Sequence, residues 1–246
     1  MPELPEGWHY RKLKELLKTI DGDRGRNYPK KHEFLQDGYC LFLSTKNVRN
    51  GNFVFDDNQF ITKNKDTTLR SGKLQINDVV ITTRGTLGNV ALYDEFIPYK
   101  RIRINSGMLI LRVSNDLLNN KFLIKFIVSP SFTSQLKVKQ SGTAQPQIPA
   151  NILREIKLPL PPLSEQQQIV SEIERRFSVA DEVEKTVGAC LQQAQRLRQS
   201  ILKRAFEGKL VPQDPNDEPA SVLLERIKLS KKSKDSKKES RQGKTR

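Results

Sequence analysis

The chain has 246 residues, of which 43 are Lys or Arg and 28 are Asp or Glu, so its formal net charge is +15 at pH 7. Its two cysteines and two histidines form neither a disulfide framework nor a metal-ligand pattern, and no apolar run is long enough to span a membrane. These features exclude a small disulfide-stabilised secreted domain, and we expect a cytoplasmic protein with no metal and no cofactor.

The positive charge is unevenly distributed along the chain. Residues 1–160 carry 25 Lys and Arg against 15 Asp and Glu, whereas residues 161–227 carry 9 against 11. A basic first part followed by a nearly neutral segment indicates that the first binds a polyanion and the second binds a protein. Basic surfaces are also common in soluble proteins, so the charge alone does not establish nucleic-acid binding.

Short strands and turns are typical of the first half of the chain. Residues 8–17 predict a strand end that runs into a short helix, and residues 39–43 predict a buried strand. The turn signal Asn50-Gly51 precedes a further apolar stretch at 53–55.

The next part of the chain continues this pattern. Residues 79–82 and 90–93 predict two strands joined by a glycine-containing loop at 84–89, and residues 108–113 predict a central strand. Apolar residues at helical spacing predict a helix over 119–129. After a loop at 141–147, order returns at Ile148 and the domain ends at 156–160. We therefore expect a mixed α/β domain that is rich in β-structure.

The predicted loops of this domain are rich in side chains that contact nucleic acid. Arg and Lys bind phosphates and guanine, while Asn and Gln pair with adenine. Loops are also polar for structural reasons, so each residue alone is weak evidence and only the set predicts a surface. The candidate DNA-contacting residues are Thr45, Lys46, Asn47, Arg49, Asn50, Arg84, Thr86, Asn89, Arg101, Arg103, Gln140, Ser141, Thr143 and Gln145.

A long helix is predicted over residues 164–207, after a proline-rich connector at 158–163. Ser164 and Gln167 have the spacing of a capping box, and Gly208 stands where a C-terminal cap glycine belongs. Such a helix is about 60 Å long. One apolar stripe runs along it, formed by Ile169, Ile173, Phe177, Ala180, Val187, Leu191, Ala194, Leu197 and Ile201.

This stripe needs a partner, because a single helix cannot bury its own apolar seam. The first half of the helix is acidic and the second half is basic, which favours an antiparallel copy of the same helix. Exposed ion pairs contribute little each, so the charges select orientation rather than supply affinity. A helix that folds back on its own domain is the alternative.

No catalytic motif is present in the sequence. There is no Gly-x-Ser-x-Gly, no His-Glu-x-x-His, no dinucleotide fingerprint, no Walker loop and no Asn-Pro-Pro-aromatic signature of adenine methyltransferases. The acidic run at 181–185 superficially resembles a nuclease metal site, but it lies within the predicted helix and is interpreted as solvated helix surface. We therefore expect a protein that is not an enzyme.

Two segments around the helix resemble a known family. Residues 156–170 (IKLPLPPLSEQQQIV) and 205–227 (AFEGKLVPQDPNDEPASVLLERI) resemble the conserved region of specificity subunits of type I restriction–modification enzymes. Residues 4–8 (LPEGW), 84–88 (RGTLG) and 141–148 (SGTAQPQI) resemble its target recognition domain. The resemblance extends from about residue 4 to residue 227.

The resemblance implies a function and a set of partners. Members of that family hold two recognition domains on an antiparallel pair of long helices, read a bipartite site in double-stranded DNA and dock other subunits. Those subunits are a methyltransferase and a translocase–endonuclease. The expected division is a recognition domain (1–157), the connector (158–163), a coiled-coil helix (164–207), a conserved segment (208–229) and a disordered basic tail (230–246).

The chain departs from the family in carrying one recognition domain and one long helix rather than two of each. We expect a half-subunit that forms a homodimer through the apolar stripe and directs adenine methylation and restriction to an inverted repeat. Pairing with a different half-subunit would give an asymmetric site. The alternative of another class is a coiled-coil scaffold whose basic domain binds nucleic acid with low specificity.

Overall fold

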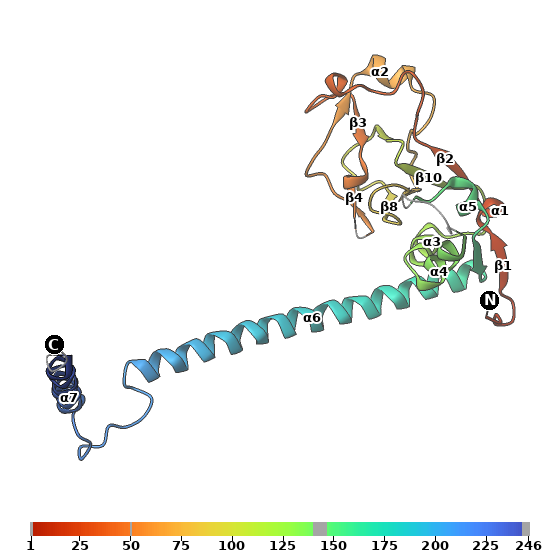
Figure 1. Cartoon of the computed structure of the whole chain (residues 1–246). Helices are drawn as coiled ribbons and strands as arrows, with labels where there is room; N and C mark the ends of the chain where they lie inside the picture. The colour runs from red at the N-terminus through yellow and green to blue at the C-terminus, as the bar shows by residue number, and fades with distance from the viewer. Residues whose placement is uncertain (1, 50, 140–146, 243–246) are drawn as a thin grey trace. The chain divides into compact units, whose positions relative to one another are not determined.

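The computed structural model describes residues 2–49, 51–139 and 147–242 (Figure 1). The strands are β1 (His9–Lys12), β2 (Leu17–Asp21), β3 (Cys40–Leu43), β4 (Val48–Arg49), β5 (Asn52–Phe53), β6 (Phe60–Ile61), β7 (Asp78–Thr82), β8 (Val90–Tyr93), β9 (Ile102–Ile104), β10 (Met108–Val113) and β11 (Lys157–Leu160). The α-helices are α1 (Leu13–Leu16), α2 (Lys63–Thr68), α3 (Asn120–Ile127), α4 (Pro130–Lys139), α5 (Ala150–Arg154), α6 (Leu163–Phe206) and α7 (Ala220–Gln242), and short 3-10 helices occupy Lys31–Glu33 and Thr45–Asn47. Two structural units meet within α6, between Ser178 and Val179.

Two sheets form the centre of the first unit. The larger has the strand order β2-β10-β7-β8 and is antiparallel throughout. The smaller has the order β6-β3-β9, in which β3 and β9 run parallel. The mixed α/β fold that the sequence predicts is confirmed.

The larger sheet is buried on both faces. Val79 and Ile81 of β7 pack with α1, α3, α4 and α5, whereas Val80 between them packs with β3 and β9 of the smaller sheet. Successive side chains of a strand point to opposite faces, so a continuous apolar run such as β7 fits a sheet that is covered on both sides. The first unit is therefore layered, with helices, the larger sheet and the smaller sheet in that order.

Several predicted elements are confirmed. The strands expected at 39–43, 79–82, 90–93 and 108–113 are β3, β7, β8 and β10, and the helix expected at 119–129 is α3. Asn119 caps α3, because its side-chain oxygen accepts hydrogen bonds from the amides of Lys121 and Phe122.

The two ends of the globular part are joined by strand pairing. β1 and β11 run antiparallel, with His9 opposite Leu160. The first turns of α6 are attached to the same region, because Trp8 Nε1 donates to Glu165 Oε1 at 3.1 Å. The fully buried Gln166 accepts a hydrogen bond from the Asn119 amide and donates to the Leu117 carbonyl. The base of α6 is therefore part of the globular unit.

The ends of α6 differ in how well they were predicted. The helix begins at Leu163 rather than after Ser164, and the carbonyl of Pro162 accepts the amides of Glu165 and Gln166. The capping box expected from Ser164 is therefore wrong. At the other end Gly208 has φ +70° and its amide donates a hydrogen bond to the Ala205 carbonyl, as in a Schellman cap.

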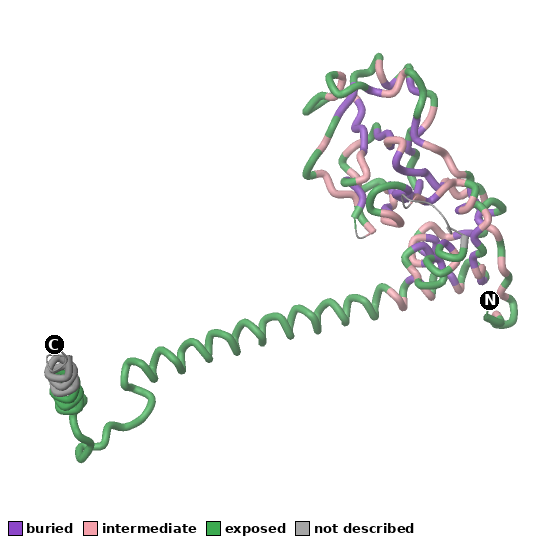
Figure 2. Tube along the Cα trace, viewed as in Figure 1, coloured by how far each residue is buried: buried purple, intermediate pink, exposed green. Residues whose placement is uncertain are grey.

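Solvent surrounds α6 beyond its base. Residues 174–232 are all exposed, and Figure 2 shows this as continuous green along the helix. Residues 230–242 of the expected disordered tail are helical in α7, a stretch without Gly or Pro that consists mostly of helix-compatible residues. Within the described ranges, none of the helices combines the length and the apolar character that crossing a membrane requires.

Candidate nucleic-acid interface

Four loops of the globular unit meet at one edge of the two sheets. β10 pairs antiparallel with β2 and β7, so its start at Met108 lies beside the ends of β2 and β7. β3 and β9 run parallel and end together at Leu43 and Ile104. We call the resulting surface the loop edge and define it as residues 22–28, 44–49, 83–89 and 105–107.

Backbone hydrogen bonds hold these loops to one another. The carbonyl of Gly107 accepts the amides of Thr83 at 2.8 Å and Arg84 at 3.2 Å, and it also accepts the Thr83 hydroxyl at 3.0 Å. The amide of Asn105 donates to the Leu43 carbonyl at 3.0 Å. The loops after β3, β7 and β9 therefore form one connected framework rather than independent flexible segments.

Close approach of neighbouring atoms explains two of the glycines in this framework, with backbone atoms nearest to Gly22 and side-chain atoms nearest to Gly107. A Cβ atom at Gly22 would lie 2.1 Å from the carbonyl oxygen of Asn105, and one at Gly107 would lie 2.9 Å from Cγ2 of Thr45. Any larger residue at Gly22 would separate the loop after β2 from the turn between β9 and β10.

Exposed cations line the loop edge. Arg24, Arg26, Lys46, Arg49 and Arg84 are all exposed and come from three of its four loops. Arg24 is held in place, because its guanidinium donates to Asp21 Oδ1 at 3.0 Å and to the Ser106 carbonyl at 3.3 Å. Such a group of cations on a framework of fixed backbone suits a polyanion.

The neutral candidates of the same surface are partly accessible. Thr86 is exposed, and Thr45 and Asn89 are half-buried. Lys46 Nζ lies 3.6 Å from Asp57 Oδ2, and both side chains are mostly exposed. The loop edge therefore brings together Thr45, Lys46, Arg49, Arg84, Thr86 and Asn89.

Asn47 is not part of this accessible surface, which corrects the expectation from the sequence. It is buried, and its side-chain oxygen accepts the Ser44 amide at 2.9 Å. Its side-chain nitrogen donates to the carbonyls of Val54 and Asp57. The amide group is fully used to shape the loop after β3, so it is not available to a base.

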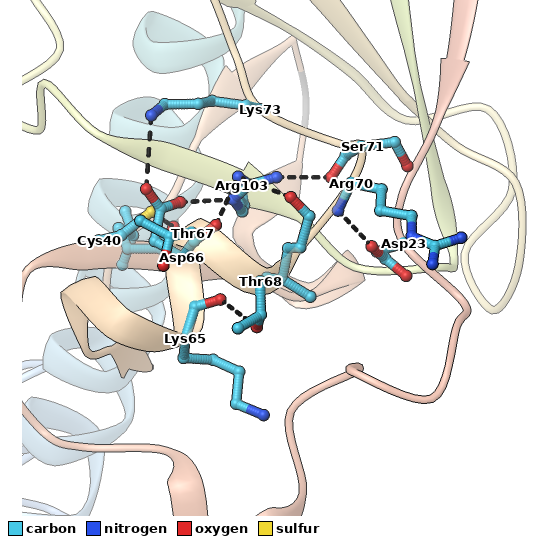
Figure 3. A network of polar contacts seen from close by, with 12 residues as sticks. Asp23, Cys40, Lys65, Asp66, Thr67, Thr68, Arg70, Ser71, Lys73 and Arg103 are labelled. Atoms are coloured by element: carbon cyan, nitrogen blue, oxygen red, sulfur yellow. Dashed lines mark hydrogen bonds and ion pairs between the residues drawn. The ribbon is translucent and has the colours of Figure 1, made fainter.

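Arg103 is also removed from the surface. It is buried on β9, where its Nε donates to Asp66 Oδ1 at 2.5 Å and its terminal nitrogens donate to the carbonyls of Ser71, Asp66 and Leu69 (Figure 3). Burial by itself would raise the pKa of Asp66, but the hydrogen bond and charge of Arg103 outweigh it and hold the pKa below its usual value. This pair anchors α2 and the chain after it to the smaller sheet.

A second buried carboxylate, that of Asp23, lies within the loop edge itself. Asp23 accepts the amide of Arg70 at 2.7 Å (Figure 3). It also accepts the amide of Gly25 at 2.7 Å. Burial opposes ionisation, yet these backbone hydrogen bonds hold the pKa of Asp23 below its usual value. The loop that carries Arg24 and Arg26 is thereby fastened to the segment after α2.

Arg101 lies at the opposite end of the smaller sheet. It precedes β9, its carbonyl accepts the Leu41 amide, and its guanidinium lies 4.5 Å from the centroid of the Tyr39 ring. β3 and β9 both run from this end toward the loop edge. Arg101 therefore does not belong with the other candidates.

The remaining candidates are Asn50, Gln140, Ser141, Thr143 and Gln145, and they lie outside the described residues. The chain returns next to the loop edge, where the Ile148 amide donates to the Thr83 carbonyl at 3.0 Å.

Sequence analysis missed the contribution of the loop after β2. The stretch Asp21-Gly22-Asp23-Arg24-Gly25-Arg26-Asn27 combines turn residues with two arginines, which is the signal that could have identified it. Among the described residues no group of three His, Cys, Asp or Glu is placed to hold a metal ion.

The apolar stripe of α6 divides into two parts. Ile169 packs against the core of the globular unit, and its neighbour Val170 is buried there. Ile169 is therefore wrongly assigned to a pairing surface. Ile173 is half-buried, and Phe177 is 57% exposed with Lys125 Nζ lying 5.6 Å from its ring centroid. The stripe members beyond them, Ala180, Val187, Leu191, Ala194, Leu197 and Ile201, are exposed.

Comparison with known proteins gives a consistent result. The family model described as the type I restriction modification DNA specificity domain matches residues 5–192. The EcoBI specificity subunit from Escherichia coli is 27% identical over 97% of this chain and 51% of its own length. The crystal structure of the HsdS subunit from Thermoanaerobacter tengcongensis is 25% identical, with a TM-score of 0.52 over 85% of this chain and 47% of that one.

A solved chain of a type I R-M system has the same fold, with a TM-score of 0.65, 21% identity, and coverage of 85% of this chain and 48% of that one. The present chain thus spans about half the length of the curated relatives and solved chains that it matches over most of its own length.

Proposed function

The chain belongs to the type I restriction–modification DNA specificity family, and from this membership we propose that it recognises a DNA sequence for a type I restriction–modification complex. Specificity subunits of this family are not catalytic, in agreement with the expectation from the sequence. The proposal assigns catalysis to a methyltransferase subunit and a translocase–endonuclease subunit, both of which this chain would direct to the target site.

The observation that carries the proposal is the loop edge. Five exposed cations and the polar residues Thr45, Thr86 and Asn89 share one surface. Backbone hydrogen bonds connect the loops after β3, β7 and β9, and the Arg24 guanidinium connects the loop after β2 to the Ser106 carbonyl. Cations bind the phosphates and set the register of the protein, while polar side chains on a rigid framework discriminate between bases. The buried pairs of Asp66 with Arg103 and of Asp23 with backbone amides support this framework.

We propose further that two copies of the chain form a homodimer through α6. The exposed fractions of Val187, Leu191 and Leu197 are 52%, 61% and 60%, which is unusual for apolar residues on one helix of a protein that acts alone. A two-fold dimer would present two loop edges and select a bipartite inverted repeat with a gap set by the helices.

The test is a genome-wide map of adenine methylation in cells that express this chain together with its cognate methyltransferase subunit. Cells that express the methyltransferase alone are the control. A new bipartite palindromic motif is the expected result, because the dimer presents the same recognition surface twice.

The other outcomes separate the parts of the proposal. A bipartite but asymmetric motif keeps sequence recognition and replaces the homodimer by pairing with a different half-subunit. No new methylation, with the methyltransferase shown to be expressed and soluble, contradicts the proposal and favours the low-specificity scaffold.

A further inference from the structure

The exposed part of α6 has a regular heptad pattern, and that pattern contains two charged residues. Alternating steps of four and three from Ile173 reach ten positions up to Ala205, as in the a and d positions of a coiled coil, and eight of these ten are apolar. The d positions are Ile173, Ala180, Val187, Ala194 and Ile201, and the a positions are Phe177, Glu184, Leu191, Arg198 and Ala205. Glu184 and Arg198 thus stand within the seam itself.

We propose that a second copy of this chain packs antiparallel on this seam in a single register, with the two-fold axis level with Ala189. The inference rests on the proposed homodimer and specifies its geometry. In an antiparallel pair each a position lies opposite a d position of the partner. In this register Glu184 lies opposite Ala194 of the second copy, and Arg198 lies opposite Ala180 of the second copy.

The alanines give the charged side chains room to meet. Glu184 of one copy and Arg198 of the second copy occupy adjacent layers of the seam, about 6 Å apart along the axis. Each layer with a charged residue has a methyl group on the other side, so the two side chains can extend toward each other and form an ion pair. The two-fold axis generates a second such pair, and the layers between them contain Leu191 and Val187.

Other arrangements do not combine the ion pair with room for it. In one of the two heptad-shifted registers Glu184 and Arg198 of the second copy still occupy adjacent layers, but neither of them faces an alanine. A shift of one heptad places Glu184 opposite Ile201 or Val187 of the second copy, and Arg198 opposite Val187 or Ile173. Either shift leaves a charge against a large apolar side chain. A parallel pair places Glu184 against Glu184 and Arg198 against Arg198, which repel. A polar pair in a coiled-coil seam is a known means of selecting one register.

The boundaries of the free helix face point to the same register. Val170 is buried in the globular unit of its own chain, so the seam becomes available only from Ile173. At the other end α6 stops at Phe206, where the chain turns through the Gly208 cap. The stretch from Ile173 to Ala205 is centred on Ala189, and the proposed register pairs this stretch from end to end.

A shifted register leaves part of the seam without a partner or blocks it. A shift in one direction places Phe177 opposite Gly208 of the second copy, beyond the end of its helix. A shift in the other direction places Ile201 opposite Val170 of the second copy, which the globular unit already covers.

The register makes a specific prediction about residues that flank the seam. Cys190, which is exposed, lies beside Cys190 of the second copy, about 3 Å apart along the axis. Val183 lies beside Leu197 of the second copy with the same stagger. A heptad shift would instead bring Cys190 beside Leu197 or beside Val183 of the second copy.

The experiment is mild oxidation of the full chain, followed by separation of cross-linked dimer from monomer without reductant. Wild-type protein should form a Cys190–Cys190 dimer. Cys40 does not interfere, because it is buried and burial raises the pKa of its thiol to about 12.

Two variants provide the matched control. Val183→Cys/Cys190→Ala and Leu197→Cys/Cys190→Ala should each fail to cross-link alone and should cross-link when mixed and allowed to exchange subunits. A dimer in which wild-type protein cross-links to either variant more readily than to itself overturns the register but keeps the homodimer. A monomer by sedimentation at micromolar concentration overturns the proposed homodimer and the register together.

Charge reversal tests the ion pair independently of cross-linking. Glu184→Arg should weaken the dimer at least about 100-fold, because it places two like charges in adjacent seam layers. The double variant Glu184→Arg/Arg198→Glu restores opposite charges and should recover most of the affinity. A double variant that dimerises no better than Glu184→Arg alone contradicts the pairing of Glu184 with Arg198.

Discussion

The loop edge and the free part of α6 are two exposed surfaces of opposite character, the first cationic and polar and the second partly apolar. At the loop edge the apolar residues are buried beneath two sheets, and the exposed side chains are mostly cationic or polar. Along α6 beyond Phe177 the backbone is a complete helix, yet Val187, Leu191 and Ile201 remain in solvent.

The two regions differ in whether their apolar side chains are buried within the chain. The globular unit has its own core, so its surface is free to be selected for binding a charged ligand. In the free part of α6 the backbone hydrogen bonds are formed, but the apolar side chains are not buried. Most helix stability in proteins comes from packing of the apolar face. We therefore expect substitutions to affect the two regions independently.

The largest expected effect is loss of the dimer in the variant Val187→Lys/Leu191→Lys. Each dimer would lose four buried apolar side chains, worth about 1.5–3 kcal/mol apiece. Sedimentation velocity at micromolar concentration should show a monomer whose globular unit unfolds at the wild-type temperature. The variant Gln193→Lys/Ser200→Lys, with the same added charge away from the seam, should remain a dimer.

The next effect is confined to the globular unit. Asp66→Ala leaves the guanidinium of Arg103 buried without its carboxylate and should destabilise this unit by about 3–5 kcal/mol in denaturant unfolding. Arg101→Ala removes an exposed arginine from the same strand region and should change stability by less than about 0.5 kcal/mol. Equal effects of the two substitutions would mean that the buried pair does not hold α2 to the sheet.

Acid sensitivity should follow the same buried carboxylates. The pKa values of Asp66 and Asp23 are lowered in the folded state, so their stabilisation is present above the usual value of 3.8. It is lost as the pH falls through the lower folded-state values, because protonation then removes their hydrogen-bond and ion-pair contributions. Asp66→Asn should flatten the dependence of unfolding free energy on pH in this range, and an unchanged slope would contradict the assignment.

Binding of DNA should distinguish the loop edge from the opposite end of the sheet. Arg84→Ala and Arg24→Ala should each cost about 1–3 kcal/mol if they contact bases, or reduce the salt dependence by about one charge if they contact phosphates. Arg101→Ala is the control and should leave both quantities unchanged. Titrations of the cognate duplex at several salt concentrations measure these effects, and a loss at Arg101 as large as at Arg84 would place the interface elsewhere.

The smallest expected effects concern two glycines near or within the free helix. Gly208→Ala should destabilise the end of α6 by about 1–2 kcal/mol, because φ at this position is +70°. Gly188→Ala should stabilise the helix by about 1 kcal/mol, since a Cβ there meets no atom within 4 Å. Thermal melts followed by circular dichroism should move in opposite directions for the two variants.

The sequence predicted the elements whose signal is local. The apolar strands β7 and β10 and the amphipathic helix α3 are apparent from spacing alone. It did not reveal α2, which is polar along its length, because α2 is held by the ion pair of Asp66 with an arginine on β9. No local pattern indicates a contact between residues 37 positions apart.

The candidate site was predicted in part for the same reason. Arg84 and Lys46 lie in loops where exposure is the usual state of a cation, and both are exposed. Arg103 has the same side chain as Arg84, but it lies between Ile102 and Ile104 on a buried strand. Its charge is neutralised within the protein by the ion pair with Asp66. That Arg24 joins the loop edge depends on the pairing of β2 with β10, which sequence analysis did not predict.

The pairing of β1 with β11 has a consequence for the exchange of recognition domains between related proteins. The chain enters the globular part at His9 and leaves it at Leu160, and these two residues are opposite each other on neighbouring strands. A domain whose ends lie together can be exchanged as a cassette when it keeps the contacts that Leu117 and Asn119 make with Gln166 at the base of the following helix. A different set of loops inserted between the same two strands would meet the same helix, so target choice and assembly can diverge separately.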